Sequence, residues 1–168
     1  MPAPSRGGRA GLVRPARAAI TAWALLGGLV LVAVVLINVL SVIGGVVWRP
    51  FPGDFEMTEI GIAVAAFAFL PYCQLTGANV TADIFTSWAS PRCIAGFSLL
   101  AAIIALAFSL LLLWRMTLGL LDQKAYGYTT AILQFPHWVA FVPILISLAL
   151  LALAAGITLV ESFRQAKA

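Results

Sequence analysis

The sequence predicts an all-α integral membrane protein with four transmembrane helices and a short amphipathic interfacial helix between the second and the third. Hydrophobic residues make up 62% of its 168 residues and charged residues only 10%, whereas soluble domains carry about 25% charged residues. The apolar residues are gathered into four long runs separated by charges. Because a backbone in lipid must satisfy its own hydrogen bonds, such runs are expected to be helices.

Each run is long enough to cross a bilayer, which takes roughly 20 apolar residues. The gaps between charges place the spans at about 19–47, 59–76, 93–115 and 137–160. The first run exceeds the about 7–15 apolar residues of a signal peptide, so we expect it to be a span. The Pro-, Gly- and Arg-rich residues 1–17 are predicted to form a disordered basic tail, and residues 18–168 the membrane domain.

The distribution of basic residues predicts the orientation. With both termini in the cytoplasm, seven Lys and Arg residues flank the inner side (Arg6, Arg9, Arg14, Arg17, Arg92, Arg164, Lys167) and three flank the outer side (Arg49, Arg115, Lys124). This bias follows the rule that positive residues stay inside. It also explains the net charge of +4 without a nucleic-acid partner.

Residues 78–90 are predicted to form the interfacial helix. On a helical wheel Val80, Ile84, Phe85 and Trp88 fall on one side and Asp83 on the other. Pro91 would end the helix, which would lie on the cytoplasmic surface of the membrane. An ordinary polar loop is the alternative. The sequon that begins at Asn79 falls on this predicted cytoplasmic side, so we do not expect it to be glycosylated.

Three polar side chains at or within the spans are candidates for contacts. Glu56 and Glu59 lie three residues apart and face the same side of the first turn of the second span. They would either cap this helix, whose N-terminus favours negative charge, or contact a partner or a cation. Asn38 lies well inside the first span, where an amide is expected to find a hydrogen-bond partner on a neighbouring helix rather than a ligand.

The sequence does not indicate an enzyme, and no catalytic, cofactor or metal site is predicted. There is one histidine, His137, and Cys73 and Cys93 do not have the spacing of a metal site. No Asp, Glu or Lys lies in the middle of a span, which disfavours a self-contained proton-coupled carrier. Such a carrier, or the membrane anchor of another complex, remains the alternative to the interpretation below.

The chain resembles the DctQ-type small membrane subunits of tripartite ATP-independent periplasmic (TRAP) transporters. The resemblance extends from about residue 19 to residue 163, and four features carry it in the order of the family. These are a basic tail before a long first span, a Pro-Gly-x-x-Glu-x-x-Glu loop (Pro52, Gly53, Glu56, Glu59), the segments Phe69–Gln74 and Gly77–Phe85, and the segment Tyr128–Trp138 before the fourth span. Asn79 stands where the family usually has histidine.

The resemblance implies a scaffold subunit in the bacterial inner membrane. A large DctM-type subunit would carry the substrate and the coupling ion, which is expected to be sodium, and a periplasmic DctP-type protein would capture an organic acid. The small subunit would brace the large one within the lipid bilayer. The residues that we then expect at the partner interface are Glu56, Glu59, Asn38, Asn79, Asp83 and Trp88.

Overall fold

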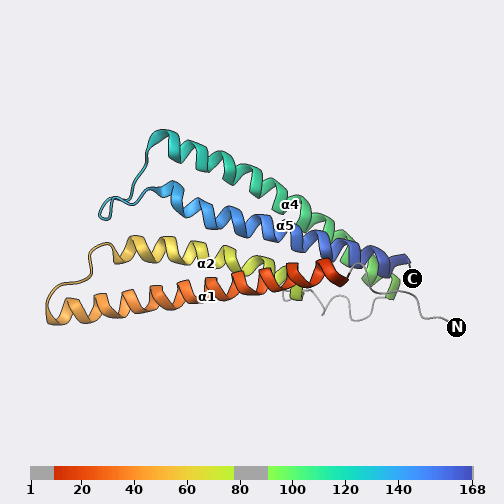
Figure 1. Cartoon of the computed structure of the whole chain (residues 1–168), viewed down its shortest axis with the longest axis horizontal. Coiled ribbons are helices and arrows are strands. Elements are labelled where there is room, and N and C mark those ends of the chain that lie inside the picture. Colours follow the sequence, from red (N-terminus) through yellow and green to blue (C-terminus); the bar gives the residue numbers. More distant parts are fainter. Residues whose placement is uncertain (1–9, 78–90, 168) are drawn as a thin grey trace.

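The computed structural model describes residues 10–77 and 91–167. This part of the chain forms four helices, α1 (Ala10–Val47), α2 (Asp54–Thr76), α4 (Pro91–Tyr126) and α5 (His137–Lys167) (Figure 1). All four are long and apolar enough to cross a membrane. Apart from one isolated bridge between Thr129 and Pro136, the described residues contain no β-structure. The predicted four-helix membrane fold is confirmed.

All four helices begin or end beyond the spans expected from the sequence. Helix α1 begins at Ala10, within the expected tail, and α2 begins at Asp54 rather than at residue 59. Helix α4 continues past Arg115 to Tyr126. The expected spans stopped at charged residues, but a helix satisfies its own backbone in water as well as in lipid and so continues beyond the bilayer.

Helix α5 begins at His137, where the sequence placed the start of the fourth span, and runs on to Lys167. The predicted interfacial helix at 78–90 lies outside the described residues.

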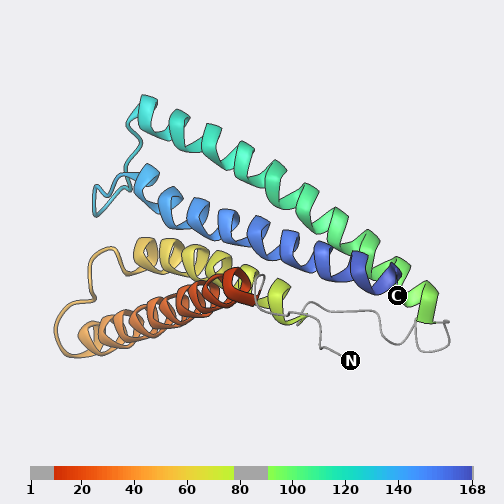
Figure 2. The same ribbon diagram turned by 45° about the vertical axis from the view of Figure 1, so that its right-hand side comes forward.

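The helices lie in an open row in the order α1, α2, α5, α4. Helices α1 and α2 form one antiparallel hairpin and α4 and α5 form another, and α2 packs against α5 to join them (Figures 1 and 2). A smaller contact joins α1 to α5. Helix α1 begins, and helix α5 ends, at the same end of the molecule (Figure 1). Both ends of the described chain therefore lie on one side of a membrane that the four helices cross.

Small residues allow α1 and α2 to approach closely. A Cβ on Gly27 of α1 would lie 2.7 Å from the Cβ of Ala68 of α2, and a Cβ on Gly61 of α2 would overlap the Val34 side chain. Close approach through small residues is the usual way in which helices associate in lipid, where burial of apolar groups gives little gain.

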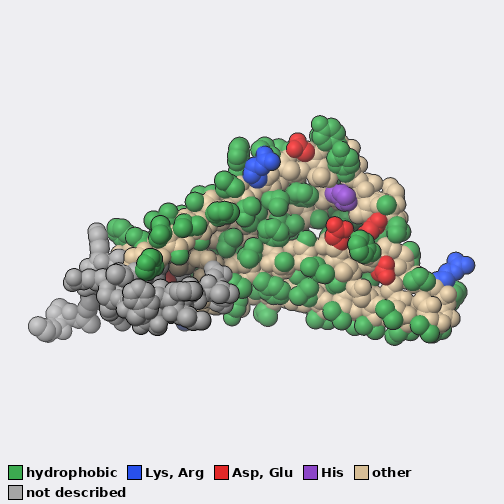
Figure 3. Space-filling view, turned by 180° about the vertical axis from the view of Figure 1, so that it is seen from behind, with side chains coloured by type: hydrophobic (Ala, Val, Ile, Leu, Met, Phe, Trp, Pro, Cys, Tyr) green, Lys and Arg blue, Asp and Glu red, His purple; other side chains and the backbone are tan. Residues whose placement is uncertain are grey.

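Most of the apolar surface is not covered by the chain itself. Only 11–28% of the most apolar window of each helix is buried. On the outermost helices of the row, Leu25 and Val46 of α1 are 72% and 84% exposed and Phe108 of α4 is 63% exposed. Figure 3 shows hydrophobic side chains spread along the helices on the face that it displays. Lipid or another apolar protein surface must cover this area.

Candidate functional site at the loop end

The two short connections lie at the end of the molecule opposite the termini, here called the loop end. Residues 48–53 connect α1 to α2, and residues 127–136 connect α4 to α5 (Figure 1). Acidic side chains gather near this end (Figure 3). Three of them, Asp54, Glu56 and Glu59, lie in the first two turns of α2. The loop end therefore holds the acidic pair that the sequence singled out.

Glu56 connects the two loops. Its Oε1 accepts a hydrogen bond from the N–H of Ile132 at 2.7 Å, and its Oε2 accepts one from the N–H of Leu133 at 3.0 Å. Both donors belong to the α4–α5 loop, 76 and 77 residues further along the chain. The carboxylate thus ties the start of α2 to this loop, a role that was neither of the two expected from the sequence.

Gly53 lets the α4–α5 loop approach the start of α2. It is the buried N-cap residue of α2 and has φ 79°, a left-handed conformation that glycine adopts without strain. A Cβ at this position would lie 2.5–2.9 Å from three carbons of the Leu133 side chain. Glu56 and Gly53 therefore hold the same loop, one through its backbone and the other by making room for its leucine.

The α4–α5 loop has internal hydrogen bonds that present those two amides. The Thr130 N–H donates to the Phe135 carbonyl at 3.0 Å, and the Phe135 N–H donates to Thr130 Oγ1, also at 3.0 Å. The His137 N–H donates to the Tyr128 carbonyl at 3.1 Å. Gln134 has φ 54°, which is uncommon for a residue with a side chain and marks a tight reversal.

Asn38 takes part in a polar network between α1 and α2. Its Nδ2 donates to Thr58 Oγ1 at 2.7 Å, and Thr58 Oγ1 donates to the Asp54 carbonyl at 2.7 Å. One turn further along α1, Ser41 donates to the Asp54 carboxylate and accepts the Phe51 N–H at 3.2 Å. The expected partner of Asn38 on a neighbouring helix is therefore Thr58, and the amide serves helix packing.

Glu59 differs from Glu56 in that it is available to a group outside the described chain. It is exposed, and within residues 10–77 and 91–167 it makes no hydrogen bond or ion pair. It lies on an exposed stripe of α2 that also contains Phe55, Ile62 and Leu70, which are 76%, 50% and 40% exposed. This stripe (residues 55, 59, 62 and 70) follows helical spacing and carries a single charge. We call it the α2 stripe.

Two polar contacts join α1 to α5. The Arg17 guanidinium forms a half-exposed ion pair with Glu161 at 3.2 Å. The Trp23 Nε1–H donates to Ser147 Oγ at 2.8 Å, and Ser147 in turn donates to the Pro143 carbonyl at 2.8 Å. Neither contact was predictable from the sequence, since the residues of each pair are more than 120 positions apart.

Asn79, Asp83 and Trp88 lie outside the described residues. Within residues 10–77 and 91–167, no three His, Cys, Asp or Glu side chains are grouped to hold a metal ion.

Residues 31–165 match the model of a protein family described as the DctQ component of tripartite ATP-independent periplasmic transporters. The chain belongs to the DctQ family. It matches no curated protein and no solved structure. The matched range includes the last part of α1 from residue 31, all of α2 and α4, both loops of the loop end and nearly all of α5. This DctQ chain is thus a multi-pass membrane protein and the small membrane subunit of a TRAP transporter.

Proposed function

We propose that this DctQ chain is a scaffold that braces a large DctM-type subunit in the bacterial inner membrane. The complex would import an organic acid, captured by a periplasmic DctP-type protein, and would couple this import to sodium. The open row of helices is the observation that carries the proposal. Only 11–28% of the most apolar window of each helix is buried within the chain, so the row offers broad apolar faces to another membrane protein.

The placement of polar groups supports a scaffold rather than a carrier. A carrier needs polar or charged groups that face a pathway through the membrane. In the described chain, Asn38 and Ser41 of α1 donate hydrogen bonds to Thr58 and Asp54 of α2. Thr58 in turn donates to the Asp54 carbonyl, and Glu56 accepts a backbone N–H of the α4–α5 loop. Within the described residues, these groups therefore hold the subunit's own shape.

Glu59 is the described residue that we propose to contact the large subunit. It sits near the start of a span, on the otherwise apolar α2 stripe. A carboxylate that faces lipid at this level is unfavourable, whereas a Lys or Arg of a partner would compensate its charge. Asn79, Asp83 and Trp88 remain proposed contacts. Glu56 and Asn38 would act indirectly, because they hold the loop end and the α1–α2 hairpin in shape.

We further propose that both termini are cytoplasmic and that the loop end is periplasmic. The two ends of the described chain lie together (Figure 1), and seven of the ten Lys and Arg residues flank that side in the sequence. A green fluorescent protein fused after Ala168 should then fluoresce, and an alkaline phosphatase fused there should be inactive. Active phosphatase with no fluorescence would reverse this orientation.

Transport measurements test the scaffold proposal. Vesicles that contain this chain alone should show no sodium-dependent uptake of any organic acid, and uptake should appear when the large subunit and the binding protein are added. Vesicles that contain the large subunit and the binding protein without this chain provide the matched control and should transport poorly. Uptake by this chain alone would overturn the proposal.

A further inference from the structure

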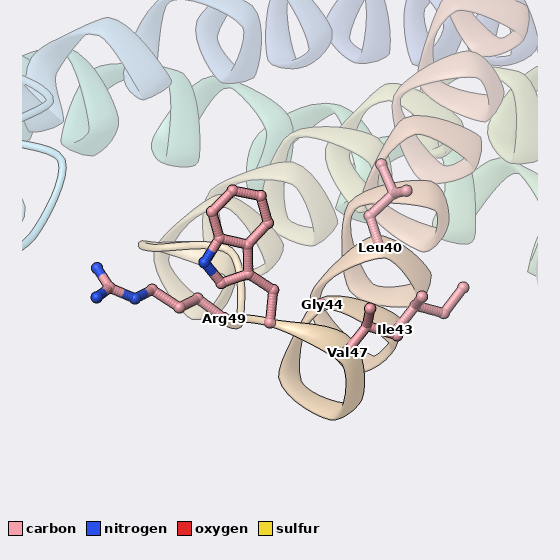
Figure 4. A pocket seen from close by; sticks show the side chains of 6 residues that line it. Leu40, Ile43, Gly44, Val47 and Arg49 are labelled. Atoms are coloured by element: carbon pink, nitrogen blue, oxygen red, sulfur yellow. The ribbon is translucent and has the colours of Figure 1, made fainter.

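An open hollow of about 610 Å³ lies where α1 ends, and it combines an apolar wall with an arginine. Its lining residues are Leu40, Ile43, Gly44, Val47, Trp48 and Arg49 (Figure 4). Leu40, Ile43 and Val47 form the apolar wall and are 62%, 54% and 78% exposed. In Figure 4 these three side chains project from α1, while the Arg49 guanidinium extends away from the helix.

Gly44 brings the arginine back to the helix. The Trp48 N–H donates to the Gly44 carbonyl at 2.8 Å, and a Cβ on Gly44 would collide with the carbonyl oxygen of Arg49. The chain therefore turns directly over the position that has no side chain. As a result, the apolar face of the last turns of α1 and the first cation after the span border the same hollow.

The Arg49 guanidinium is not neutralised by the described chain. It is exposed, and the first two acidic groups that follow it are engaged elsewhere, Asp54 by Ser41 and Glu56 by the α4–α5 loop. Within residues 10–77 and 91–167, the ion pair that forms is that of Arg17 with Glu161, near the other end of the molecule. Arg49 is thus free to bind an anion supplied from outside.

We propose that this hollow binds a phospholipid of the membrane leaflet at the loop end. The Arg49 guanidinium would hold the lipid phosphate, whose oxygens match its planar set of donors. One acyl chain would lie on Leu40, Ile43 and Val47, which extend over about 10 Å of helix at 1.5 Å per residue. Trp48 would lie at headgroup level, where tryptophan is enriched. This site is independent of substrate transport.

The apolar wall favours a lipid over an acidic segment of protein. The wall descends from the end of the span into its hydrocarbon level, where a hydrated acidic peptide would lose its water. A phospholipid carries both required groups, a phosphate at the interface and a chain below it. The arginine would bind the phosphate and the apolar wall would contact the acyl chain, so a phospholipid would contact both the charged and the apolar part of the hollow.

Fluorescence quenching in detergent tests the proposal. The full chain, purified free of lipid in a maltoside detergent, is titrated with phosphatidylglycerol whose acyl chains carry bromine. The difference between the wild type and Trp48→Phe gives the quenching of Trp48. This quenching should saturate, and brominated diacylglycerol, which has no phosphate, should give no saturable quenching. Soluble glycerol phosphate should not displace the lipid, because it has no acyl chain.

Two variants locate the phosphate contact. Arg49→Gln should raise the half-saturating lipid concentration about fivefold, the effect of one arginine near an anionic surface. Arg115→Gln removes an exposed cation of α4 that does not line the hollow, and it should bind as the wild type does. Unchanged binding by Arg49→Gln would overturn the proposal. Equal quenching of the wild type by brominated diacylglycerol would also overturn it, and this comparison does not need a folded Arg49 variant. Displacement of the lipid by glycerol phosphate would overturn it as well.

Discussion

The Glu56 carboxylate accepts the backbone N–H of Leu133 at 3.0 Å, and this contact joins two loops that are far apart in the sequence. The same carboxylate accepts the Ile132 N–H at 2.7 Å. Because α2 and α5 also form the contact between the two hairpins, Glu56 locks the hairpins together at the loop end. The surface that the small subunit offers to a partner depends on how the two hairpins are held.

Replacing Glu56 by alanine should release the α4–α5 loop without unfolding the helices. The amides of Ile132 and Leu133 lose an ionised acceptor, so their hydrogen exchange should become faster by roughly an order of magnitude. Exchange measured by mass spectrometry on the chain in detergent checks this. Glu59→Ala is the matched control and should leave the loop unchanged. Equal exchange in Glu56→Ala and the wild type would show that the contact does not hold the loop.

Gly53→Ala should destabilise the chain by about 2 kcal/mol or more. The substitution forces a side chain into a left-handed backbone conformation and into contact with Leu133. Thermal unfolding in mild detergent, followed by circular dichroism, measures the loss. Adding Leu133→Ala should recover the part that comes from crowding and leave the part that comes from the backbone. Full recovery, or no loss in the single variant, would contradict this explanation.

Asn38→Leu should lower stability by about 1 kcal/mol and leave transport by the assembled complex intact, because the amide bonds to Thr58 between two helices. Thr58→Val removes the other partner and should have a similar effect. The double variant should be less destabilised than the sum of the two, since both remove one interaction. Loss of transport in Asn38→Leu with normal stability and assembly would instead support the self-contained carrier.

Glu59→Gln should weaken co-purification of the large subunit while the amount of this chain in the membrane stays the same. We expect a loss of roughly tenfold in the amount of partner recovered, as for the removal of one member of a desolvated charge pair. Asp122→Asn, which removes an exposed acid of α4, is the matched control and should have little effect. Equal recovery with Glu59→Gln and the wild type would remove Glu59 from the proposed interface.

The sequence predicted the helices better than it predicted their contacts. Long uncharged runs identified four spans because lipid permits little other backbone structure, and the position of Asn38 predicted a polar contact between helices. The use of Glu56 was not predictable, since the groups that it binds are backbone amides 76 and 77 residues away. Any residue can supply such amides, so the sequence of the loop carries no signal for them.

The order of the helices in the row could not be predicted from the sequence either. The four runs are apolar on all sides, so their periodicity does not show which face meets which neighbour. Gly27 and Gly61 did indicate close helix packing, since small residues are enriched where helices meet in membranes. Helix α1 also begins before its predicted span, because a helix readily carries residues such as Arg14 and Arg17 out of the bilayer.

The central claim, that this chain braces a larger membrane subunit, is tested most directly by recovery of the tagged chain from native membranes in mild detergent, with its companions identified by mass spectrometry. The scaffold function predicts a stoichiometric partner with many more membrane spans, retained by the wild type and reduced in Glu59→Gln. That partner would also identify the transported acid. Recovery of this chain alone, or only with copies of itself, would contradict the claim.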